Sequence, residues 1–155
     1  MEIENHQEVK LHNLLSYRHK IKEEDIDNEF AEMATFIDEN DLNQVGGIIT
    51  TVHKLDRESD LLDMEIMIPI ENSTDNLSKY TIKPVFHLIN ALYLSYQGNP
   101  SDLSNAHQKI FKYVAANKLQ PITPLYNFYS NKIEEAQSLE ELKVDLLIGI
   151  NPSVL

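Results

Sequence analysis

Two stretches of the sequence match each other at a constant separation, and this internal repeat constrains the fold more than any other feature. Residues 37–49, IDENDLNQVGGII, align with residues 114–126, VAANKLQPITPLY, when the chain is shifted by 77 positions. Further along, a shift of 80 aligns Glu65 with Asp145. Such a period predicts two copies of one supersecondary unit that share a core.

Each copy shows the hydrophobic pattern of a strand, a helix and two further strands. In the first copy we expect strands over residues 14–21 and 48–53. Residues 62–70 alternate between apolar and polar side chains, which is the period of a half-buried strand. Residues 24–39 carry apolar residues at spacings of four, three and four, which form one stripe of a helix. That stripe consists of Ile26, Phe30, Met33 and Ile37.

The second copy repeats this plan. A strand is expected over residues 91–97, and Ser101 or Ser104 can cap the helix that follows by accepting a backbone N–H bond. Strands over residues 125–129 and 142–150 complete the copy.

These elements predict one domain with a defined architecture. We expect residues 1–10 to be a flexible acidic lead-in and residues 11–152 to be a single domain, with halves of about 11–71 and 80–152. The fold class is α+β, a pseudo-two-fold tandem repeat of β-α-β-β units whose antiparallel sheet carries two main helices on one face. The groove where such halves meet is the default ligand site.

Composition excludes several classes of protein. The chain of 155 residues has a formal charge of −12 and contains no cysteine. An acidic surface repels phosphate backbones and anionic membranes, so we expect no direct nucleic-acid partner and no membrane partner. The lack of cysteine excludes disulfides and thiolate nucleophiles.

Targeting and cofactor signals are also missing from the sequence. The first residues do not form a signal peptide, and no apolar run reaches the roughly 18 residues of a membrane span, which predicts a cytoplasmic protein. The six histidines lack the spacing of metal ligands, and four glycines do not form a phosphate-binding loop. We therefore expect no metal and no cofactor.

Several segments together resemble a known family. Residues 91–100, ALYLSYQGNP, followed by a helix that ends near Asn117, resemble the gyrase-inhibitor-like family, also called AraC-type effector-binding domains. Residues 46–50, GGIIT, and residues 63–70, DMEIMIPI, are similar to it as well, so the resemblance covers about residues 11–152. It implies a small-molecule-binding module with a hydrophobic, aromatic-lined groove. Some members of the family follow a DNA-binding head, others stand alone or bind proteins, and a subset is similar to hydrolases.

The sequence departs from this family at one position. The resemblance implies a Glu-x-Tyr motif whose carboxylate meets a cationic ligand or serves catalysis, but here the matching residues are Asn127-Phe128-Tyr129. An amide can form hydrogen bonds but cannot neutralise a buried cation or act as a general base. We therefore expect no enzymatic activity. About ten residues precede the domain and none forms a basic recognition helix, which predicts a protein without a DNA-binding head.

The first candidate ligand-binding residues are aromatic and polar side chains on predicted strands. Asn127 and Tyr129 are two residues apart and share a strand face, as do Tyr17 and His19. The shift of 77 aligns His19 with Tyr96, which indicates a groove lined from both halves. The alternative interpretation is that these side chains are half-buried members of the core.

The remaining candidate is a carboxylate. Glu65 and its repeat mate Asp145 lie on faces opposite the apolar stripes and can supply the negative charge that Asn127 lacks. The alternative is that both are charges on a solvated sheet face.

Three functions are compatible with these features. The first is a stand-alone domain that binds a small amphipathic or aromatic molecule between its halves. The second is an acidic module that binds or inhibits a basic partner protein and has lost the ligand-binding carboxylate. The third, a hydrolase, has the weakest support because Asn127 replaces the expected Glu. The sequence does not predict the oligomeric state.

Overall fold

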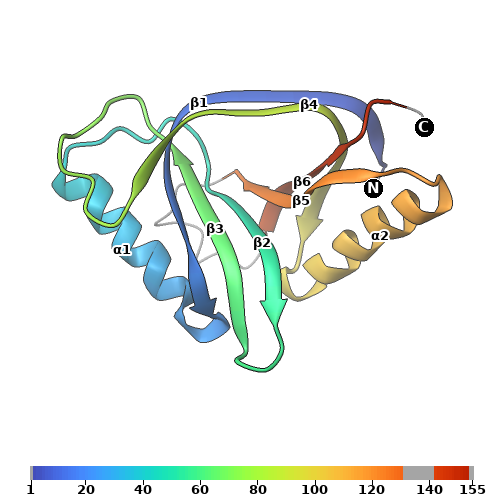
Figure 1. Ribbon diagram of the computed structural model, residues 1–155, viewed down its shortest axis with the longest axis horizontal. Helices are drawn as coiled ribbons and strands as arrows, with labels where there is room; N and C mark the ends of the chain where they lie inside the picture. Colours follow the sequence, from blue (N-terminus) through green and yellow to red (C-terminus); the bar gives the residue numbers. More distant parts are fainter. Residues whose placement is uncertain (1, 131–141, 154–155) are drawn as a thin grey trace.

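The structure, a computed structural model, describes residues 2–130 and 142–153. Six strands and two α-helices follow one another in two β-α-β-β series (Figure 1). Short 3₁₀ turns, η1 (Glu23–Asp25) and η2 (Pro100–Asp102), lead into the two helices. The elements are β1 (Glu4–Lys22), α1 (Ile26–Glu39), β2 (Ile49–Asp56), β3 (Leu61–Pro69), β4 (Thr81–Gly98), α2 (Leu103–Ala116), β5 (Pro121–Tyr129) and β6 (Leu142–Ile150).

The strands form one antiparallel sheet that closes into a barrel in the order β1-β3-β2-β5-β6-β4. The predicted α+β fold with six antiparallel strands and two helices is confirmed. The closure was not predicted, and it arises because β1 and β4 are long enough to pair with each other as well as with strands of their own halves. Residues 4–10 are therefore not a flexible lead-in, since they form the start of β1 and pair with β4.

Two strand pairings define a pseudo-two-fold axis. In the β1–β4 pair Lys10 lies opposite His87, and in the β2–β5 pair Thr50 lies opposite Asn127. Both pairs consist of residues 77 positions apart, which is the shift of the sequence repeat. A residue that pairs with its own repeat mate lies on the symmetry axis, so the axis runs through both pairings.

The two helices end in the same way. Asn40 after α1 and Asn117 after α2 each donate a side-chain hydrogen bond of 2.9 Å to a carbonyl of the last helical turn, that of Phe36 and that of Tyr113. The same two carbonyls also accept the backbone N–H groups of Asn40 and Asn117, so each side chain adds a second hydrogen bond where its helix ends. The repeat thus preserves the amide side chains that end the helices, as well as the apolar stripes.

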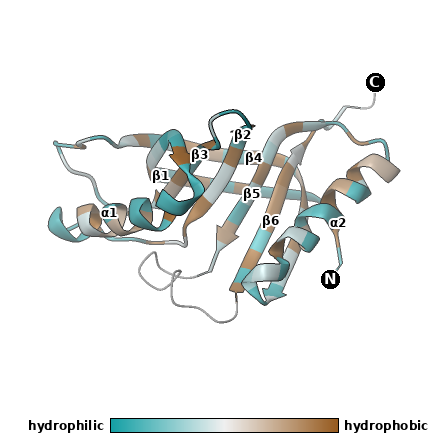
Figure 2. Ribbon diagram, turned by 90° about the horizontal axis from the view of Figure 1, so that it is seen from below, coloured by the Kyte–Doolittle hydropathy of each residue, from teal (hydrophilic) through white to brown (hydrophobic). Residues whose placement is uncertain are grey.

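The core consists of three clusters of buried side chains. One lies between α1 and the outer face of β1 and β3, and the second lies between α2 and the outer face of β4 and β6. Figure 2 shows the helices banded in hydrophilic and hydrophobic residues, as expected for helices that cover a sheet on one side. The third cluster fills the interior of the barrel and contains Leu14, Ile49, Met67, Phe86, Leu88, Ala91, Tyr126 and Leu147.

Neither helix in the described part of the chain has the length and hydrophobicity of a membrane-spanning helix.

Candidate ligand-binding site

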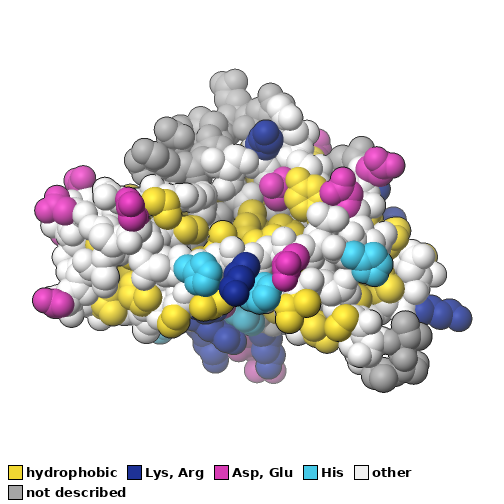
Figure 3. All heavy atoms as spheres, turned by 90° about the horizontal axis from the view of Figure 1, so that it is seen from above, with side chains coloured by type: hydrophobic (Ala, Val, Ile, Leu, Met, Phe, Trp, Pro, Cys, Tyr) yellow, Lys and Arg dark blue, Asp and Glu magenta, His cyan; other side chains and the backbone are white. Residues whose placement is uncertain are grey.

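The pseudo-two-fold axis passes close to an apolar pocket, which we call the axial pocket. It has a volume of about 360 Å³ and lies between β1, the segment before β2, and the end of β5. In Figure 3 hydrophobic side chains are visible in a hollow behind a row that contains histidine, basic and acidic side chains. Such a volume suits a small organic molecule. The pocket is lined by Lys10, Leu11, His12, Val45, Gly46, Gly47, Ile49, Pro69, Phe128 and Tyr129.

Aromatic side chains lie next to the axial pocket inside the barrel. Phe128 lines the pocket, and its ring contacts that of Phe86 edge-on, with ring centroids 5.8 Å apart. Phe86 in turn contacts Tyr126 at 4.9 Å, also edge-on. Phe128 and Tyr126 are two residues apart on β5, so both side chains face the barrel interior. One wall of the pocket, Phe128, therefore packs against the aromatic interior, and it presents a surface that apolar and aromatic molecules prefer.

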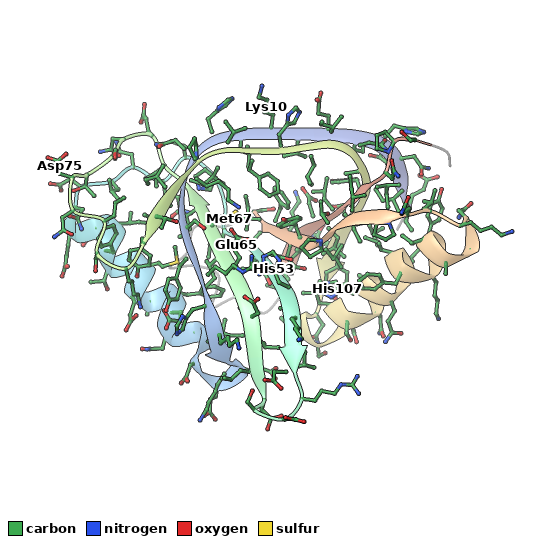
Figure 4. The ribbon with its side chains drawn as sticks, in the orientation of Figure 1. Lys10, His53, Glu65, Met67, Asp75 and His107 are labelled. Carbon is green, nitrogen blue, oxygen red and sulfur yellow. The ribbon has the colours of Figure 1, made fainter. Side chains whose placement is uncertain are left out.

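A buried carboxylate lies farther along the interior. Glu65 on β3 is only 6% exposed. Its Oε1 lies 2.9 Å from Nε2 of His53, and its Oε2 accepts hydrogen bonds from Nζ of Lys83 at 2.8 Å and from Oγ of Ser16 at 3.3 Å. Figure 4 shows Glu65, His53 and Met67 beneath the ribbon formed by β1 and β4, whereas Lys10 lies on the outside of that ribbon.

These partners keep Glu65 ionised. Burial raises the pKa of Glu65, but hydrogen bonds from Lys83 and His53 lower it more, so the pKa lies below its ordinary value. The sequence did not indicate Lys83, His53 or Ser16 as partners of Glu65, because the four residues come from four strands, and β1 and β4 meet β3 and each other only through long-range pairing.

Asp145 is the structural equivalent of Glu65. Glu65 pairs with Arg18 of β1, and Asp145 pairs with Ser95 of β4, which is the repeat mate of Arg18. Oδ1 of Asp145 accepts a hydrogen bond of 2.9 Å from the hydroxyl of Tyr93. Both carboxylates therefore face away from the helices. Glu65 is bound by side chains of β1, β2 and β4, whereas Asp145 is bound by a side chain of β4.

Asn127 lies on the outer face of β5, at the pseudo-two-fold axis. Its Oδ1 lies 2.8 Å from Nε2 of His107 on α2, and its Nδ2 donates to Oγ1 of Thr50 at 3.3 Å. Tyr129 lies on the same face, where burial raises the pKa of its hydroxyl and a hydrogen bond with Thr50 lowers it. The amide of Asn127 therefore links α2 to β2 and β5.

Tyr17 and His19 lie on the α1 side of β1. Their rings stack with centroids 5.8 Å apart, and Tyr17 packs against the cluster under α1. The ring of Tyr17 also lies 4.7 Å from Nζ of Lys79. Tyr17 and His19 share the face of Leu15, as their spacing predicts. That face packs under α1 and does not line the axial pocket.

Tyr96 is a member of the second helix-covered cluster. It is 5% exposed, and its hydroxyl donates a hydrogen bond to the carbonyl of Asn99. Of the six candidate residues, Tyr129 alone lines the axial pocket, and Glu65 alone is buried in the barrel interior. The sequence pattern did not point to Val45, Gly46 or Leu11 as pocket residues.

Among the described residues, no three His, Cys, Asp or Glu side chains come together in a way that suits a metal ion.

Comparison with known proteins finds similarity in structure but not in sequence. No family model matches the chain, and no curated protein matches it. The C-terminal domain of EcmrR matches with a TM-score of 0.70 and 13% identity over 98% of each chain. EcmrR in a complex with DNA matches with a TM-score of 0.80 and 13% identity, and the match covers 98% of this chain and 58% of the EcmrR chain.

Two further solved structures extend the comparison. SAV2435 bound to tetraphenylphosphonium matches with a TM-score of 0.58 and 12% identity, over 98% of this chain and 95% of SAV2435. A hydrolase from Listeria innocua matches with a TM-score of 0.61 and 11% identity, over 97% of this chain and 91% of the hydrolase. At such identities the likeness establishes the fold, and it agrees with the effector-binding fold that the sequence resemblance implies.

Proposed function

We propose that this protein binds a small amphipathic or aromatic molecule in the axial pocket between its two halves. The observation that carries the proposal is the position of the pocket: an apolar space of about 360 Å³ adjoins the residues on the pseudo-two-fold axis. Ligand pockets of roughly 300–1,000 Å³ with mostly apolar walls bury most of a small organic molecule.

The ligand class follows from the walls of the pocket. Leu11, Ile49 and Phe128 present apolar or aromatic surface, and none of the lining residues is acidic. A neutral aromatic or amphipathic molecule therefore fits this pocket better than a small polar ion. The fold of SAV2435, which was solved with the aromatic cation tetraphenylphosphonium, supports the choice of an aromatic ligand.

The role that we assign to the candidate residues follows from their positions. Tyr129 contacts the ligand directly, whereas Asn127 positions β5 and α2 around the site through its bonds to Thr50 and His107. Tyr17, His19 and Tyr96 stabilise the helix-covered clusters and are not part of the proposed pocket. Hydrolysis is not included in the proposal, because the amide of Asn127 cannot act as a general base.

A thermal-shift experiment tests this function. The probes are a neutral aromatic compound, 2-naphthol, and the amphipathic cation tetraphenylphosphonium. Val45 lines the pocket and is 59% exposed, so Val45→Trp can fill the space without disturbing the core. Val52→Trp is the matched control, since Val52 is 41% exposed on β2 and is not a pocket residue.

Two results decide between the alternatives. We expect 2-naphthol to raise the melting temperature of the wild type and of Val52→Trp but not of Val45→Trp. If neither compound stabilises the wild type, or if Val45→Trp responds like the wild type, the axial pocket is not the binding site.

A second candidate function is the binding of a partner protein. Phe111 on α2 is 49% exposed and Ile89 on β4 is 68% exposed, and exposed aromatic and aliphatic side chains are common at interfaces. The formal charge of −12 favours a basic partner. Recovery of one stoichiometric partner by the wild type and its loss with Phe111→Ala supports this function, and recovery of the same partner by both proteins contradicts the role of Phe111.

A further inference from the structure

One stretch of β2 has a neighbouring strand on only one side. β2 pairs with β3 as far as Asp56, but it pairs with β5 only over residues 49–51. Figure 1 shows β2 and β5 diverging beyond this short pairing, so that the hairpin of β2 and β3 extends away from β5. No other described strand pairs with residues 52–56 on that side. These residues, which we call the open edge, therefore direct some of their backbone N–H and C=O groups away from the sheet.

The sequence of β5 explains why its pairing with β2 stops. Two residues beyond the last pair, the register would place Pro124 opposite His53, and proline has no N–H group to donate. One residue earlier, the carbonyl of Leu125 already accepts a hydrogen bond of 2.7 Å from Oγ1 of Thr51. The open edge is therefore a consequence of the sequence, and a strand from another molecule can add to it.

The open edge carries exposed aliphatic side chains next to charges of both signs. Val52 is 41% exposed and Leu55 is 51% exposed. Lysine is common on edge strands, because its charge opposes pairing with unrelated strands. Here Lys54 and Asp56 carry opposite charges on either side of Leu55, and neither forms an ion pair within the described part of the chain. A matching strand must therefore present an acidic and a basic residue in the reverse order.

A second copy of the open edge presents that order. When two antiparallel copies pair about Leu55, this residue lies opposite its own counterpart, and Lys54 of each copy lies opposite Asp56 of the other. Residues directly opposite each other share a face, with Cβ atoms about 4.5–5.5 Å apart, and opposite charges at such positions stabilise a sheet. Pairing about Lys54 or about Asp56 places like charges opposite each other, which is destabilising. The sequence therefore favours the register about Leu55.

We propose that two copies of this chain associate through their open edges, which pair in antiparallel about Leu55 and join the two sheets across a two-fold axis. This inference goes beyond the proposed function, because residues 52–56 are not part of the axial pocket. A contact of this size is characteristic of a transient interface, so the dimer forms at high protein concentration. Each chain has a formal charge of −12, and about 150 mM NaCl screens the repulsion between distant charges of the two copies.

Sedimentation equilibrium tests the association and its order of charges. At about 500 µM the mean mass of the wild type is expected to approach twice the monomer mass of 17.9 kDa, and at about 1 µM to equal the monomer mass. Lys54→Asp places two acidic residues opposite each other at both positions, and Asp56→Lys places two basic residues there. We expect each of these variants to remain at 17.9 kDa at both concentrations.

Combining the two changes restores the attraction. In an equimolar mixture of Lys54→Asp and Asp56→Lys, each acidic residue lies opposite a basic one, so we expect the mixture to reach the mean mass of the wild type. The variant Lys54→Asp/Asp56→Lys reverses both charges and is expected to associate as the wild type does. Lys112→Asp is the matched control, since it makes the same charge change at an exposed position on α2 and is expected to associate normally.

A single cysteine locates the contact. The chain has no cysteine, so Leu55→Cys introduces a thiol without competitors. Opposite residues of antiparallel strands lie within the Cα separation that a disulfide spans. We expect mild oxidation to link Leu55→Cys into dimers about tenfold faster than Val85→Cys, because pairing raises the local concentration of the thiols. Val85 is 45% exposed on β4, away from the open edge. Adding Lys54→Asp is expected to slow Leu55→Cys to the rate of Val85→Cys.

Several results would overturn the proposal. A wild type that remains at 17.9 kDa at about 500 µM excludes the dimer and leaves the open edge to a strand of another protein. Association that Lys54→Asp and Asp56→Lys both retain, or a mixture of the two that remains monomeric, excludes the register about Leu55. Circular dichroism shows whether each variant is folded. If one of them is not, the rates of Leu55→Cys and Val85→Cys decide, and equal rates reject the contact.

Discussion

Nε2 of His107 lies 2.8 Å from Oδ1 of Asn127, and this bond joins α2 to β5 at the pseudo-two-fold axis. At the position where the family resemblance implies a carboxylate, the chain thus has an amide that is bound within the protein. Asn127 accepts from one half of the molecule and donates to Thr50 of the other. Its role in the described structure is to hold the halves together.

A double-mutant cycle measures this link. Asn127→Ala and His107→Ala each remove one partner of the bond, and we expect each to lower the free energy of unfolding by about 1 kcal/mol. Because the two side chains contact each other, the double variant is expected to lose less than the sum, with a coupling of about 1 kcal/mol. Urea unfolding measures all four proteins, and additive losses contradict a stabilising bond.

The ionised state of Glu65 predicts a dependence of stability on pH. Its pKa is lowered in the folded protein, because the bonds from Lys83 and His53 outweigh the effect of burial. The unfolded chain therefore binds a proton to Glu65 at a higher pH than the folded chain does, and stability falls as the pH decreases below about 4.3, through the lowered pKa.

Glu65→Gln isolates this contribution. At pH 7 we expect the variant to be less stable than the wild type by about 2 kcal/mol, because Lys83 loses its charged partner inside the barrel. The difference narrows towards pH 3, since the wild type protonates Glu65 and the variant has no proton to bind there. Urea unfolding between pH 3 and pH 7 gives both curves, and parallel curves show that Glu65 is not the group responsible.

Asn13 has a backbone conformation that predicts a specific order of stabilities. Its φ is 60°, and its Nδ2 donates a hydrogen bond of 2.8 Å to the carbonyl of Ile70. Asn13→Ala loses the bond and places alanine in the left-handed region, a cost of about 2 kcal/mol. Asn13→Gly loses only the side-chain hydrogen bonding, and its free energy of unfolding is expected to be about 1 kcal/mol higher than that of Asn13→Ala. Chemical denaturation ranks the three proteins, and a glycine variant less stable than the alanine variant contradicts the assignment.

Gly149 provides a test of packing between β5 and β6. A Cβ atom at this position would lie 2.7 Å from Cγ2 of Thr123, whose Oγ1 accepts a hydrogen bond from the backbone N–H of Gly149. Gly149→Ala is expected to cost about 2 kcal/mol through this clash. Thr123→Ser removes Cγ2 and keeps Oγ1, which lies 3.0 Å from the added Cβ, so Thr123→Ser/Gly149→Ala is expected to recover part of the loss. Thermal unfolding shows whether it does, and a double variant no more stable than Gly149→Ala excludes the clash as the cause.

The sequence predicted the order and type of the elements because their signals are local. The alternation of residues 62–70 and the apolar stripe of residues 24–39 each follow from a single period, and the structure has a strand and a helix there. The first halves of β1 and β4 were missed. The left-handed Asn13 interrupts the alternation of β1, and Pro84 interrupts that of β4, so only long-range pairing reveals the full strands.

The site was less predictable for a related physical reason. Spacing shows which residues share a face, as with Tyr17 and His19, but not which element covers that face. Lys83 was hidden as a partner of Glu65 because it lies on β4, which is joined to β3 through β1, and spacing did not show that His53 on the neighbouring strand β2 reaches the same carboxylate. The axial pocket depends in the same way on the closure of the barrel.

The most direct test of the account is the position of a bound probe. Isotope-filtered nuclear Overhauser spectra of the wild type with 2-naphthol measure which side chains lie next to the aromatic protons of the probe. We predict cross-peaks to the methyl groups of Leu11 and Ile49, which line the axial pocket. Cross-peaks confined to side chains outside the pocket, or saturable binding that Val45→Trp does not affect, would contradict the account.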